Sequence, residues 1–382
     1  MRELISLAAY APPTMPTEHT VRRVLTKLKM RMGVADAGPL LHQDAFERAS
    51  LVALDLSAQP AGGFLRDALD VELQRWLMTS TPANWLNLLV LPPCDDSDLV
   101  GSWATAAGHQ LLAPPQRHAL TALQPPELPE LDGSGLLVIP RLERWFIRQR
   151  SGLRLVRELL ARLSALERHC LIGCNSWAWR FLVKAIGADA LLPQPRTLAP
   201  TDASRLRDWF AGHAVDDQGR RITFRTTLSG QDVLATDDAG KLVNNHLQQL
   251  AARSLGIPWV AGQLWRASLN VRTGDDKVSD RARRAIADDE RTVWVASIED
   301  CSLPRGHEDR SLLALHALLI HGALTAQELA AVLPATGEPD VMPALVAAGW
   351  VQREARLYRV SAGAYPALRQ ALQSAGMPLG RM

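Results

Sequence analysis

The chain has 382 residues and a mass of 41.8 kDa, which exceeds one average domain and predicts two or three. Hydrophobic residues make up 47% and charged residues 21%, values that fit a globular protein and exclude disordered, collagen-like and low-complexity classes. A formal net charge of +2 gives no whole-chain argument for binding nucleic acid or a membrane. Four cysteines do not make a disulfide scaffold, and no charged segment followed by a long apolar one opens the sequence. We therefore expect a cytoplasmic protein.

Residues 1–49 are expected to form an N-terminal tail and a basic amphipathic helix. Prolines at positions 12, 13 and 16 interrupt any regular pattern in residues 1–19. Residues 20–32 (TVRRVLTKLKMRM) then place apolar side chains at helical spacing. Five basic residues and no acid lie on this helix: Arg22, Arg23, Lys27, Lys29 and Arg31. Two interpretations stay open, a solvated face or a contact with an anionic partner or with anionic lipid headgroups at a membrane surface.

Residues 50–199 alternate between strand and helix patterns. Short apolar runs at 51–56, 85–91, 136–139 and 170–174 predict four strands. Helical periodicity covers 64–78, 99–108 and about 152–167, and a proline-rich connection spans 113–135. Strands that alternate with helices predict an α/β domain with a parallel sheet whose faces are covered.

The rest of the chain divides into two regions. Residues 200–300 are expected to be mainly helical, with a hairpin between Val233 and Val243. Residues 305–382 form a distinct unit that begins with an apolar helix at 311–321. Thr325 and Glu328 make a capping box for a second helix, which runs to residue 333. A third helix at about 339–348, two strands at 350–351 and 357–360, and a last helix at 365–372 complete the unit.

This order of elements resembles that of AAA+ and related signal-transduction P-loop ATPases, especially the branch of Orc/Cdc6-like and transposition ATPases. The resemblance covers about residues 50–290 and, more loosely, the C-terminal unit, which resembles a winged helix. It implies an α/β fold with a parallel-sheet, P-loop NTPase-like (AAA+-like) domain at 50–199. It further implies a helical lid at 200–300 and a winged helix at 305–382.

The resemblance places a phosphate-binding loop directly after the strand at 85–91. Such a loop needs glycines, whose backbone N–H groups cradle the phosphates, and a lysine that neutralises them. The sequence has other residues at these positions: Pro92, Pro93, Cys94, Asp95, Asp96, Ser97 and Asp98. Leucine and aspartate replace the two glycines and serine replaces the lysine, so three carboxylates would repel a polyphosphate. Of the five lysines in the chain only Lys241 follows a glycine, and it lies in the predicted hairpin.

The other motif positions of the family are altered as well. Magnesium-binding acids of a Walker B motif should follow the strand at 136–139, but Pro140 and Arg141 stand there, with Glu143 out of register. Asn175 matches the sensor-1 position at the end of the strand at 170–174, and a structural role in the turn is the alternative. Tryptophan replaces the sensor-2 arginine of the lid, for which Arg266 would either substitute or be an ordinary surface arginine.

The C-terminal unit shows no clear DNA-binding pattern. A recognition helix brings arginine, lysine or amide side chains to phosphates and base edges, but the predicted third helix carries two acids and no base. Residues 308–382 hold six acidic and six basic residues. Arg353, Arg356 and Arg359 lie in the predicted wing, where they would reach phosphate. Protein binding is favoured for this unit, and nucleic-acid binding stays the alternative.

No metal or nucleophile motif is recognisable in the sequence. His-Glu-x-x-His, Cys-x-x-Cys and Gly-x-Ser-x-Gly are all absent, and Cys170 and Cys174 fit core packing on a strand better than a metal half-site. Trp145, Trp177 and Trp179 are expected either to fill the former nucleotide cleft or to pack in the core. We expect no metal and no cofactor.

Loss of the charged catalytic positions with retention of the scaffold pattern predicts a pseudo-ATPase. The predicted role is that of a non-catalytic adaptor or regulatory subunit, which acts through protein–protein interaction in a larger, oligomeric assembly. Two alternatives remain, a DNA-associated ATPase of the initiator or transposition type and an ATPase with an unconventional nucleotide site.

Overall fold

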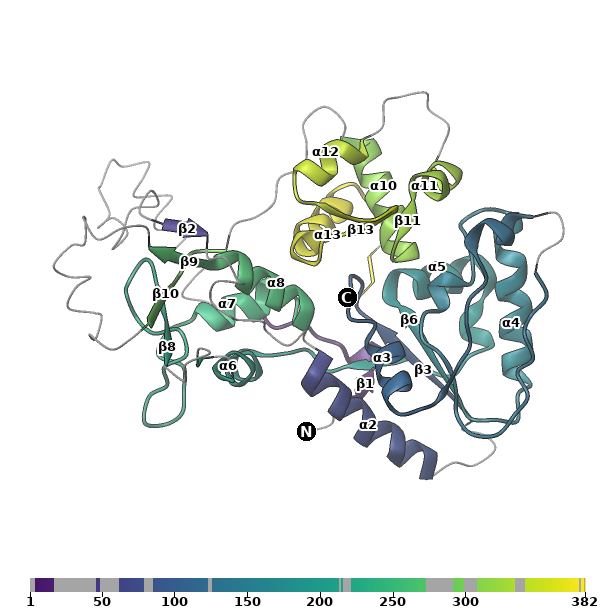
Figure 1. The fold of residues 1–382 in the computed structure, drawn as a ribbon, viewed down its shortest axis with the longest axis horizontal. Helices are drawn as coiled ribbons and strands as arrows, with labels where there is room; N and C mark the ends of the chain where they lie inside the picture. Colours follow the sequence, from purple (N-terminus) through teal and green to yellow (C-terminus); the bar gives the residue numbers. More distant parts are fainter. Residues whose placement is uncertain are drawn as a thin grey trace. The chain divides into compact units, whose positions relative to one another are not determined.

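The computed structural model describes residues 4–16, 46–48, 62–78, 85–122, 126–212, 214–215, 221–272, 291–298, 308–333, 341–377, 379–380 and 382 (Figure 1). The chain divides into two compact units: residues 1–11, 60–199 and 300–382 form the first, and residues 12–59 and 200–299 form the second. The C-terminal segment thus belongs to the first unit, whereas the sequence predicts a distinct unit at 305–382. The predicted strand at 51–56 and helix at 20–32 lie outside the described residues. Within the described ranges, no helix is long and apolar enough to span a membrane.

Among the described residues of the first unit, six strands form a sheet of order β1-β7-β3-β6-β5-β4. They are β1 (Leu4–Ser6), β3 (Leu86–Leu91), β4 (Gln110–Leu111), β5 (Leu137–Ile139), β6 (Cys170–Asn175) and β7 (Arg196–Leu198). All neighbouring strands pair in parallel except β1, which is antiparallel to β7. The predicted α/β class with a parallel sheet is therefore confirmed.

The central strands β3 and β6 end at the same level. Their side chains are almost all buried, as expected for strands with both faces covered. Their register places Leu91 opposite Asn175. Gly173 allows β5 and β6 to approach, because a Cβ at this position would lie 2.3 Å from the carbonyl oxygen of Pro140. The loops that follow β3, β5 and β6 consequently meet at the carboxyl edge of the sheet.

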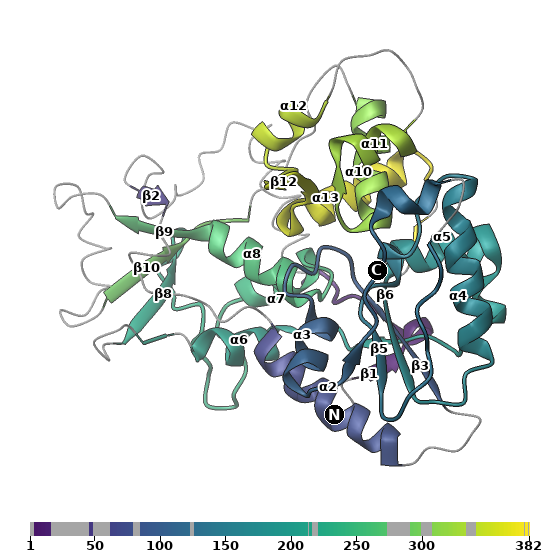
Figure 2. The ribbon, with the colours of Figure 1, turned by 45° about the vertical axis from the view of Figure 1, so that its right-hand side comes forward.

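Helices cover both faces of this sheet, α2 (Gly62–Met78) and α3 (Leu99–Ala106) on one side, α4 (Arg154–Ser164) and α5 (Ser176–Ile186) on the other (Figure 1, Figure 2). The strand order explains this arrangement. The connection from β3 to β4 crosses the sheet in one direction, and those from β5 to β6 and from β6 to β7 cross it in the other. Right-handed crossovers then place the connecting helices on opposite faces.

The start of the chain corrects the prediction of a tail at 1–19. Leu4–Ser6 forms an edge strand of the sheet, and the Ser6 hydroxyl caps a short 3-10 turn at Leu7–Ala9. Strands of two or three residues, which include β4 and β7, are too short to produce a periodic pattern in the sequence. In the proline-rich connection at 113–135, residues Arg117–Thr121 form the 3-10 turn η4.

The C-terminal module, residues 308–382, packs through α10 against α5 of the same unit. It consists of α10 (Glu308–His321), β11 (Leu324–Thr325), α11 (Ala326–Val332), α12 (Met342–Ala347), β12 (Val351–Glu354), β13 (Leu357–Val360) and α13 (Tyr365–Ser374). The three strands pair antiparallel in the order β11-β13-β12. The predicted capping box of Thr325 and Glu328 is present. The predicted third helix is described only from Met342, since residues 334–340 lie outside the described part of the chain.

The second unit, taken by itself, is a mixed α/β structure, which corrects the prediction of a mainly helical lid. Its described elements are β2 (Phe46–Arg48), α6 (Ala203–Ala211), β8 (Ile222–Thr226), α7 (His246–Arg253), α8 (Pro258–Ser268), β9 (Leu269–Arg272) and β10 (Arg291–Val295). The strands form a sheet of order β2-β9-β10-β8. Phe224 and Val293 from this sheet share a core with Phe210 and Trp265, whose rings stack with centroids 4.6 Å apart.

The hairpin predicted between Val233 and Val243 is a tight turn with a single bridge between Thr236 and Leu242. The carboxylate of Asp237 accepts hydrogen bonds from two backbone N–H groups of the turn, at 2.8 and 3.0 Å. The turn residues were therefore recognised correctly, although no regular strand pair flanks them in the described residues.

Candidate functional site

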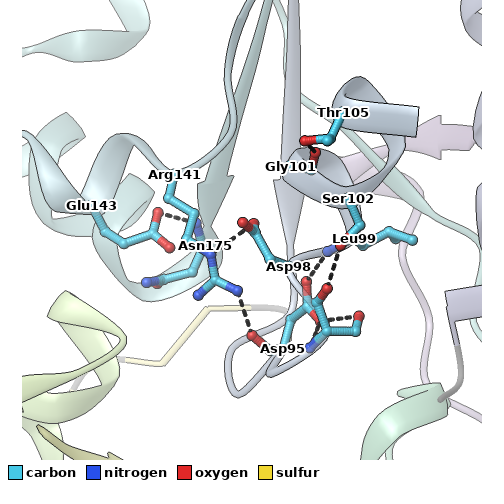
Figure 3. Close-up of polar contacts among 10 residues, drawn as sticks. Asp95, Asp98, Leu99, Gly101, Ser102, Thr105, Arg141, Glu143 and Asn175 are labelled. Atoms are coloured by element: carbon cyan, nitrogen blue, oxygen red, sulfur yellow. Dashed lines mark hydrogen bonds and ion pairs between the residues drawn. The ribbon is translucent and has the colours of Figure 1, made fainter. Parts of the chain in front are cut away.

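The loop between β3 and α3 closes on itself through Asp95. One carboxylate oxygen of Asp95 accepts hydrogen bonds from the backbone N–H (3.0 Å) and the hydroxyl (2.6 Å) of Ser97. The other oxygen accepts from the backbone N–H of Leu99 at 2.9 Å (Figure 3). Backbone N–H groups at the start of a helix are the groups that bind a phosphate in a P-loop. Here a carboxylate of the chain itself occupies them.

Two residues of this loop adopt a left-handed backbone conformation although they are not glycines. Cys94 has a φ of +66° and Asp98 a φ of +47°. Such a conformation costs about 1 kcal/mol or more per residue and persists only where the surroundings enforce it. Gly101 makes room for the Asp98 side chain, because a Cβ at this position would lie 2.3 Å from the carboxylate. The loop is thus held in one defined shape.

Arg141, which follows β5, reaches across to this loop. Its Nε donates to the Asp98 carboxylate at 2.9 Å, and its Nη2 donates to the Asp95 carbonyl oxygen at 2.8 Å. Burial by itself lowers the pKa of Arg141, but the carboxylates of Glu143, Asp98 and Asp95 raise it above its ordinary value overall. Acids thus stand in the loop after β3 and a base follows β5, whereas a P-loop ATPase has a lysine in the first of these places and acids in the second.

Glu143 lies behind this pair and is only 4% exposed. Its Oε2 accepts a hydrogen bond from the backbone N–H of Asn175 at 3.1 Å. Burial raises the pKa of Glu143, although the nearby Arg141 acts to lower it. The carboxyl group thus fixes the adjoining strand end through Oε2.

Asn175 uses its side chain to join three parts of the first unit. Its Oδ1 accepts from the backbone N–H groups of Trp177 (3.0 Å) and Ala178 (2.8 Å) and so caps α5. Its Nδ2 donates to the carbonyl oxygen of Ile320 in α10 at 3.3 Å. This capping role accounts for an asparagine at the strand end without any contact to a ligand.

A cavity of about 60 Å³ remains between these groups. It is lined by Leu91, Pro92, Pro93, Cys94, Asp95, Asp96, Asp98, Val100, Pro140, Arg141, Glu143, Cys174, Asn175, Gly322, Ala323 and Arg359. Three of the lining residues, Asp95, Asp96 and Asp98, are aspartates of the loop after β3.

Arg117 ties the C-terminal module to the rim of the cavity. Its Nη2 donates to the carbonyl oxygen of His321 at 2.6 Å, and its Nη1 donates to that of Ala323. These carbonyls follow the last turn of α10, where a helix leaves acceptors unsatisfied and its dipole favours a cation. Burial lowers the pKa of Arg117 to about 10, although Glu328 acts to raise it. Nothing in the sequence singled out Arg117, because its partner His321 lies 204 residues away and contributes only a backbone atom.

Two neighbouring side chains dock the module in the same way. Arg148 donates through Nη2 to the carbonyl oxygen of Val332 at 3.1 Å, and Gln149 donates to that of Ala331. Both acceptors lie at the end of α11. The backbone N–H of Arg148 also donates to Nε2 of the buried His321, at 3.3 Å. Carbonyls at the ends of two helices of the module therefore add to the packing of α10 against α5.

The structure brings most of the predicted site residues together. The loop after β3, the residues after β5, and Asn175 all meet at the carboxyl edge of the sheet, and Arg359 of strand β13 joins them at the cavity. Arg359 pairs with Glu354 at 2.8 Å. Arg353 lies 5.6 Å above the ring of Tyr358, and neither it nor the exposed Arg356 lines the cavity.

Other predicted residues lie elsewhere. Arg266 belongs to α8 in the second unit. The basic residues of the predicted N-terminal helix lie outside the described residues: Arg22, Arg23, Lys27, Lys29 and Arg31. Trp145, Trp177 and Trp179 are buried in the core and none of them lines the cavity, so they do not fill the former cleft. Trp177 instead donates to the hydroxyl of Tyr365 at 3.0 Å.

Cys170 and Cys174 pack in the core, with side chains at most 2% exposed. Burial raises the pKa of both thiols, which keeps them protonated and poor metal ligands. In the described part of the chain, no group of three or more metal-binding side chains comes together.

No protein-family model matches the chain, and no curated protein matches its sequence. Several solved structures are remotely similar. The Orc2 protein of Aeropyrum pernix, in ADPNP and ADP complexes, is 14% identical with a TM-score of 0.32, over 82% of this chain and 94% of that one. A RuvB mutant of Thermotoga maritima is 16% identical with a TM-score of 0.28, over 88% and 100%. Cdc6p of Pyrobaculum aerophilum is 14% identical with a TM-score of 0.19, over 98% and 100%. All three TM-scores lie below 0.5, so no conclusion about activity follows, and the α/β fold rests on the sheet topology.

Proposed function

We propose that this chain is a non-catalytic, AAA+-like adaptor or regulatory subunit that acts through protein–protein interaction in a larger assembly. The observation that carries the proposal is the arrangement of charge at the loop after β3, where Asp95 caps α3 and Asp98 holds Arg141. An ATPase needs the opposite arrangement, because the polyphosphate is anionic and magnesium has to be held by acids beside it.

The size of the repulsion supports this proposal. Two like charges 4 Å apart repel by about 4 kcal/mol at the effective dielectric constant of about 20 that suits sites near a protein surface. Two such contacts offset about 8 kcal/mol, which is the whole binding free energy of a ligand with a micromolar Kd. Four acidic residues, Asp95, Asp96, Asp98 and Glu143, line the cavity against two arginines, Arg141 and Arg359, so a bound polyphosphate would meet an excess of two acidic side chains.

The C-terminal module is part of the same proposal, as a winged helix that binds protein and not DNA. Its order of helices and strands and its three-stranded antiparallel sheet support the winged-helix interpretation. The described residues of α12, Met342–Ala347, include no basic side chain. Of the wing arginines, Arg359 is directed to the cavity and Arg353 to Tyr358, which leaves Arg356 for a partner.

The decisive experiment is a calorimetric titration of the full chain with ATP and with ADP in the presence of magnesium. We expect no heat of binding at high micromolar nucleotide. The matched variant Asp96→Ala/Asp98→Ala removes two carboxylates, and weak binding that appears only in this variant would support the repulsion argument. Tight binding by the unaltered chain would overturn the proposal and favour the alternative of a DNA-associated ATPase.

The partner-binding half of the proposal is tested by co-purification from cell extract. Reversing Arg22, Arg23, Lys27 and Lys29 to glutamate should reduce recovery of the partner while the circular dichroism spectrum stays unchanged. Equal recovery with the reversed chain would remove the N-terminal basic segment from the proposal.

A further inference from the structure

A second group of arginines lies outside the cavity, at the start of α4. The turn η4 packs against the 3-10 turn η6 (Ser151–Leu153), which leads directly into α4. Residues 113–126 and 144–157 contain no aspartate or glutamate, and the second segment holds five arginines. Arg117, the only charged residue of the first segment, is largely enclosed, so the exposed charge at this surface comes from the second segment.

Three of these arginines form the solvent side of the helical run. Arg150, Arg154 and Arg157 are exposed, whereas Leu155 and Val156 between them are buried against the sheet. We refer to the three as the arginine face. Within the part of the chain that the structure describes, none of them pairs with a carboxylate. Further along the same helix, the only acid of the exposed side is bound by Arg162 at 2.8 Å.

Helix stability does not account for the arginine face. The N-terminal end of a helix carries a partial positive charge, which favours acids and disfavours cations. The first turn of α4 contains no acid, and its cap residue makes no side-chain hydrogen bond to the helix. By contrast, α6 begins at Asp202, whose carboxylate accepts from the backbone N–H of Arg205 at 3.0 Å. The position of these arginines thus favours a role outside folding.

The composition of the face selects among anionic partners. Protein interfaces and membrane-surface helices rely on apolar or aromatic anchors, but in the described residues of 113–122 and 144–157 no large apolar side chain is exposed. A nucleic-acid backbone needs only cations, because its binding is driven by the release of counterions. Guanidinium groups suit it further, since they donate two parallel hydrogen bonds to one phosphate. We infer that the arginine face binds the phosphate backbone of nucleic acid without reading its sequence.

The test is fluorescence anisotropy of a labelled duplex DNA of about 20 base pairs, titrated with the full chain at salt concentrations from about 50 to 200 mM. The logarithm of the affinity should fall linearly with the logarithm of the salt concentration. Arg154→Glu/Arg157→Glu should weaken binding about tenfold or more and reduce the salt slope by about 2, one for each phosphate that the variant can no longer neutralise. The matched control Arg162→Gln, on the same helix, should leave the slope unchanged.

The Tm of the double variant shows whether the substitutions disturb the fold. Glutamate at the start of α4 is favoured by the helix dipole, so the Tm of the double variant should not fall. Reversal of Arg22 and Arg23 separates any contribution of the N-terminal basic segment, and it should leave the effect of the double variant in place. The inference is overturned if the unaltered chain does not bind the duplex at low salt, or if the double variant binds equally well. Binding to phosphatidylserine vesicles without binding to DNA would likewise overturn it, in favour of a membrane contact.

Discussion

The first unit uses arginine in two opposite ways, at the carboxyl edge of the sheet and at the start of α4. At the edge, Arg117 and Arg141 are largely enclosed and donate to carbonyl and carboxylate oxygens of the chain. At the start of α4, the arginine face is exposed and has no acidic partner among the described residues. Basic residues therefore cannot be assigned to ligands by counting charge. Burial and the identity of the acceptor separate the structural arginines from those that remain available.

Arg168 is the most complete structural example. It is 7% exposed, and its guanidinium donates to the carbonyl oxygens of Leu131, Asp132, Ser134 and Gly135 and to the side chain of Gln110. A single side chain thus fixes the connection that leads into β5. The glycines and polar residues there have little apolar surface of their own with which to pack.

The contrast between enclosed and exposed arginines is tested most strongly by Arg168→Ala. Four carbonyl oxygens would lose the buried guanidinium that donates to them, so we expect the free energy of unfolding to fall by about 3 kcal/mol or more. Urea denaturation followed by tryptophan fluorescence measures the loss. Arg162→Ala, an exposed arginine in an ion pair, should cost less than about 1 kcal/mol. Equal losses in the two variants would show that burial does not distinguish the two classes of arginine.

A smaller effect is expected for Arg117→Gln. Glutamine retains one amide donor but loses the fork that spans the carbonyls of His321 and Ala323, so we expect a loss of about 2 kcal/mol. Hydrogen exchange should speed up at the end of α10 and leave the centre of the sheet unchanged. Arg356→Gln, in the exposed turn between β12 and β13, is the control and should change neither quantity. Unchanged exchange at α10 in Arg117→Gln would mean that the module is held by its other contacts alone.

The smallest expected effect is that of replacing Asp202, which caps α6, and it tests the contrast between the starts of α6 and α4. Burial acts to raise the pKa of Asp202, but hydrogen bonds from the Arg205 N–H and from Ser204 lower it below its ordinary value of 3.8 overall. A lowered pKa in the folded state stabilises the fold above pH 3.8, and this contribution disappears as the pH falls through the folded-state pKa. Asp202→Ala should therefore cost about 0.5–1 kcal/mol at pH 7.

The same substitution should cost almost nothing well below pH 3.8. Urea denaturation of both chains at pH 7 and at acid pH measures the difference. An equal cost at both values would show that the carboxylate charge does not stabilise the start of α6. It would also weaken the argument that arginines at the start of α4 oppose the helix.

The sequence predicted features that depend on neighbouring residues. The absence of a P-loop lysine and glycines after the strand at 85–91 can be read from the sequence because such a motif is one short segment, and the capping box at Thr325 follows from a spacing of three residues. The long strands β3 and β6 were found because both faces are covered and their residues are almost all apolar. These elements were enough to predict the α/β fold and the edge of the sheet at which the altered motifs meet.

Features that depend on distant backbone atoms were not predictable. The sequence shows that Asp98 and Arg141 are misplaced for an ATPase, but not that they bind each other, 43 residues apart. Arg117 and Arg168 bind carbonyl oxygens, which every residue has and which leave no trace in composition. In the second unit the sequence does carry a strand signal, because residues 222–226 (ITFRT) alternate between apolar and polar residues. The helical patterns elsewhere in 200–300 outweighed this signal and led to the prediction of a mainly helical region.

Docking through backbone carbonyls has a consequence for how the C-terminal module can diverge. Arg117, Arg148, Gln149 and Asn175 all recognise main-chain oxygens of the module, and these oxygens are the same whatever side chains the module carries. These four contacts thus depend on the shape of the module's helix ends, whereas His321 and Tyr365 are also bound through their side chains. Substitutions on the outward surface of the module can accumulate, and its binding preferences can change, while its seat on the sheet is inherited intact.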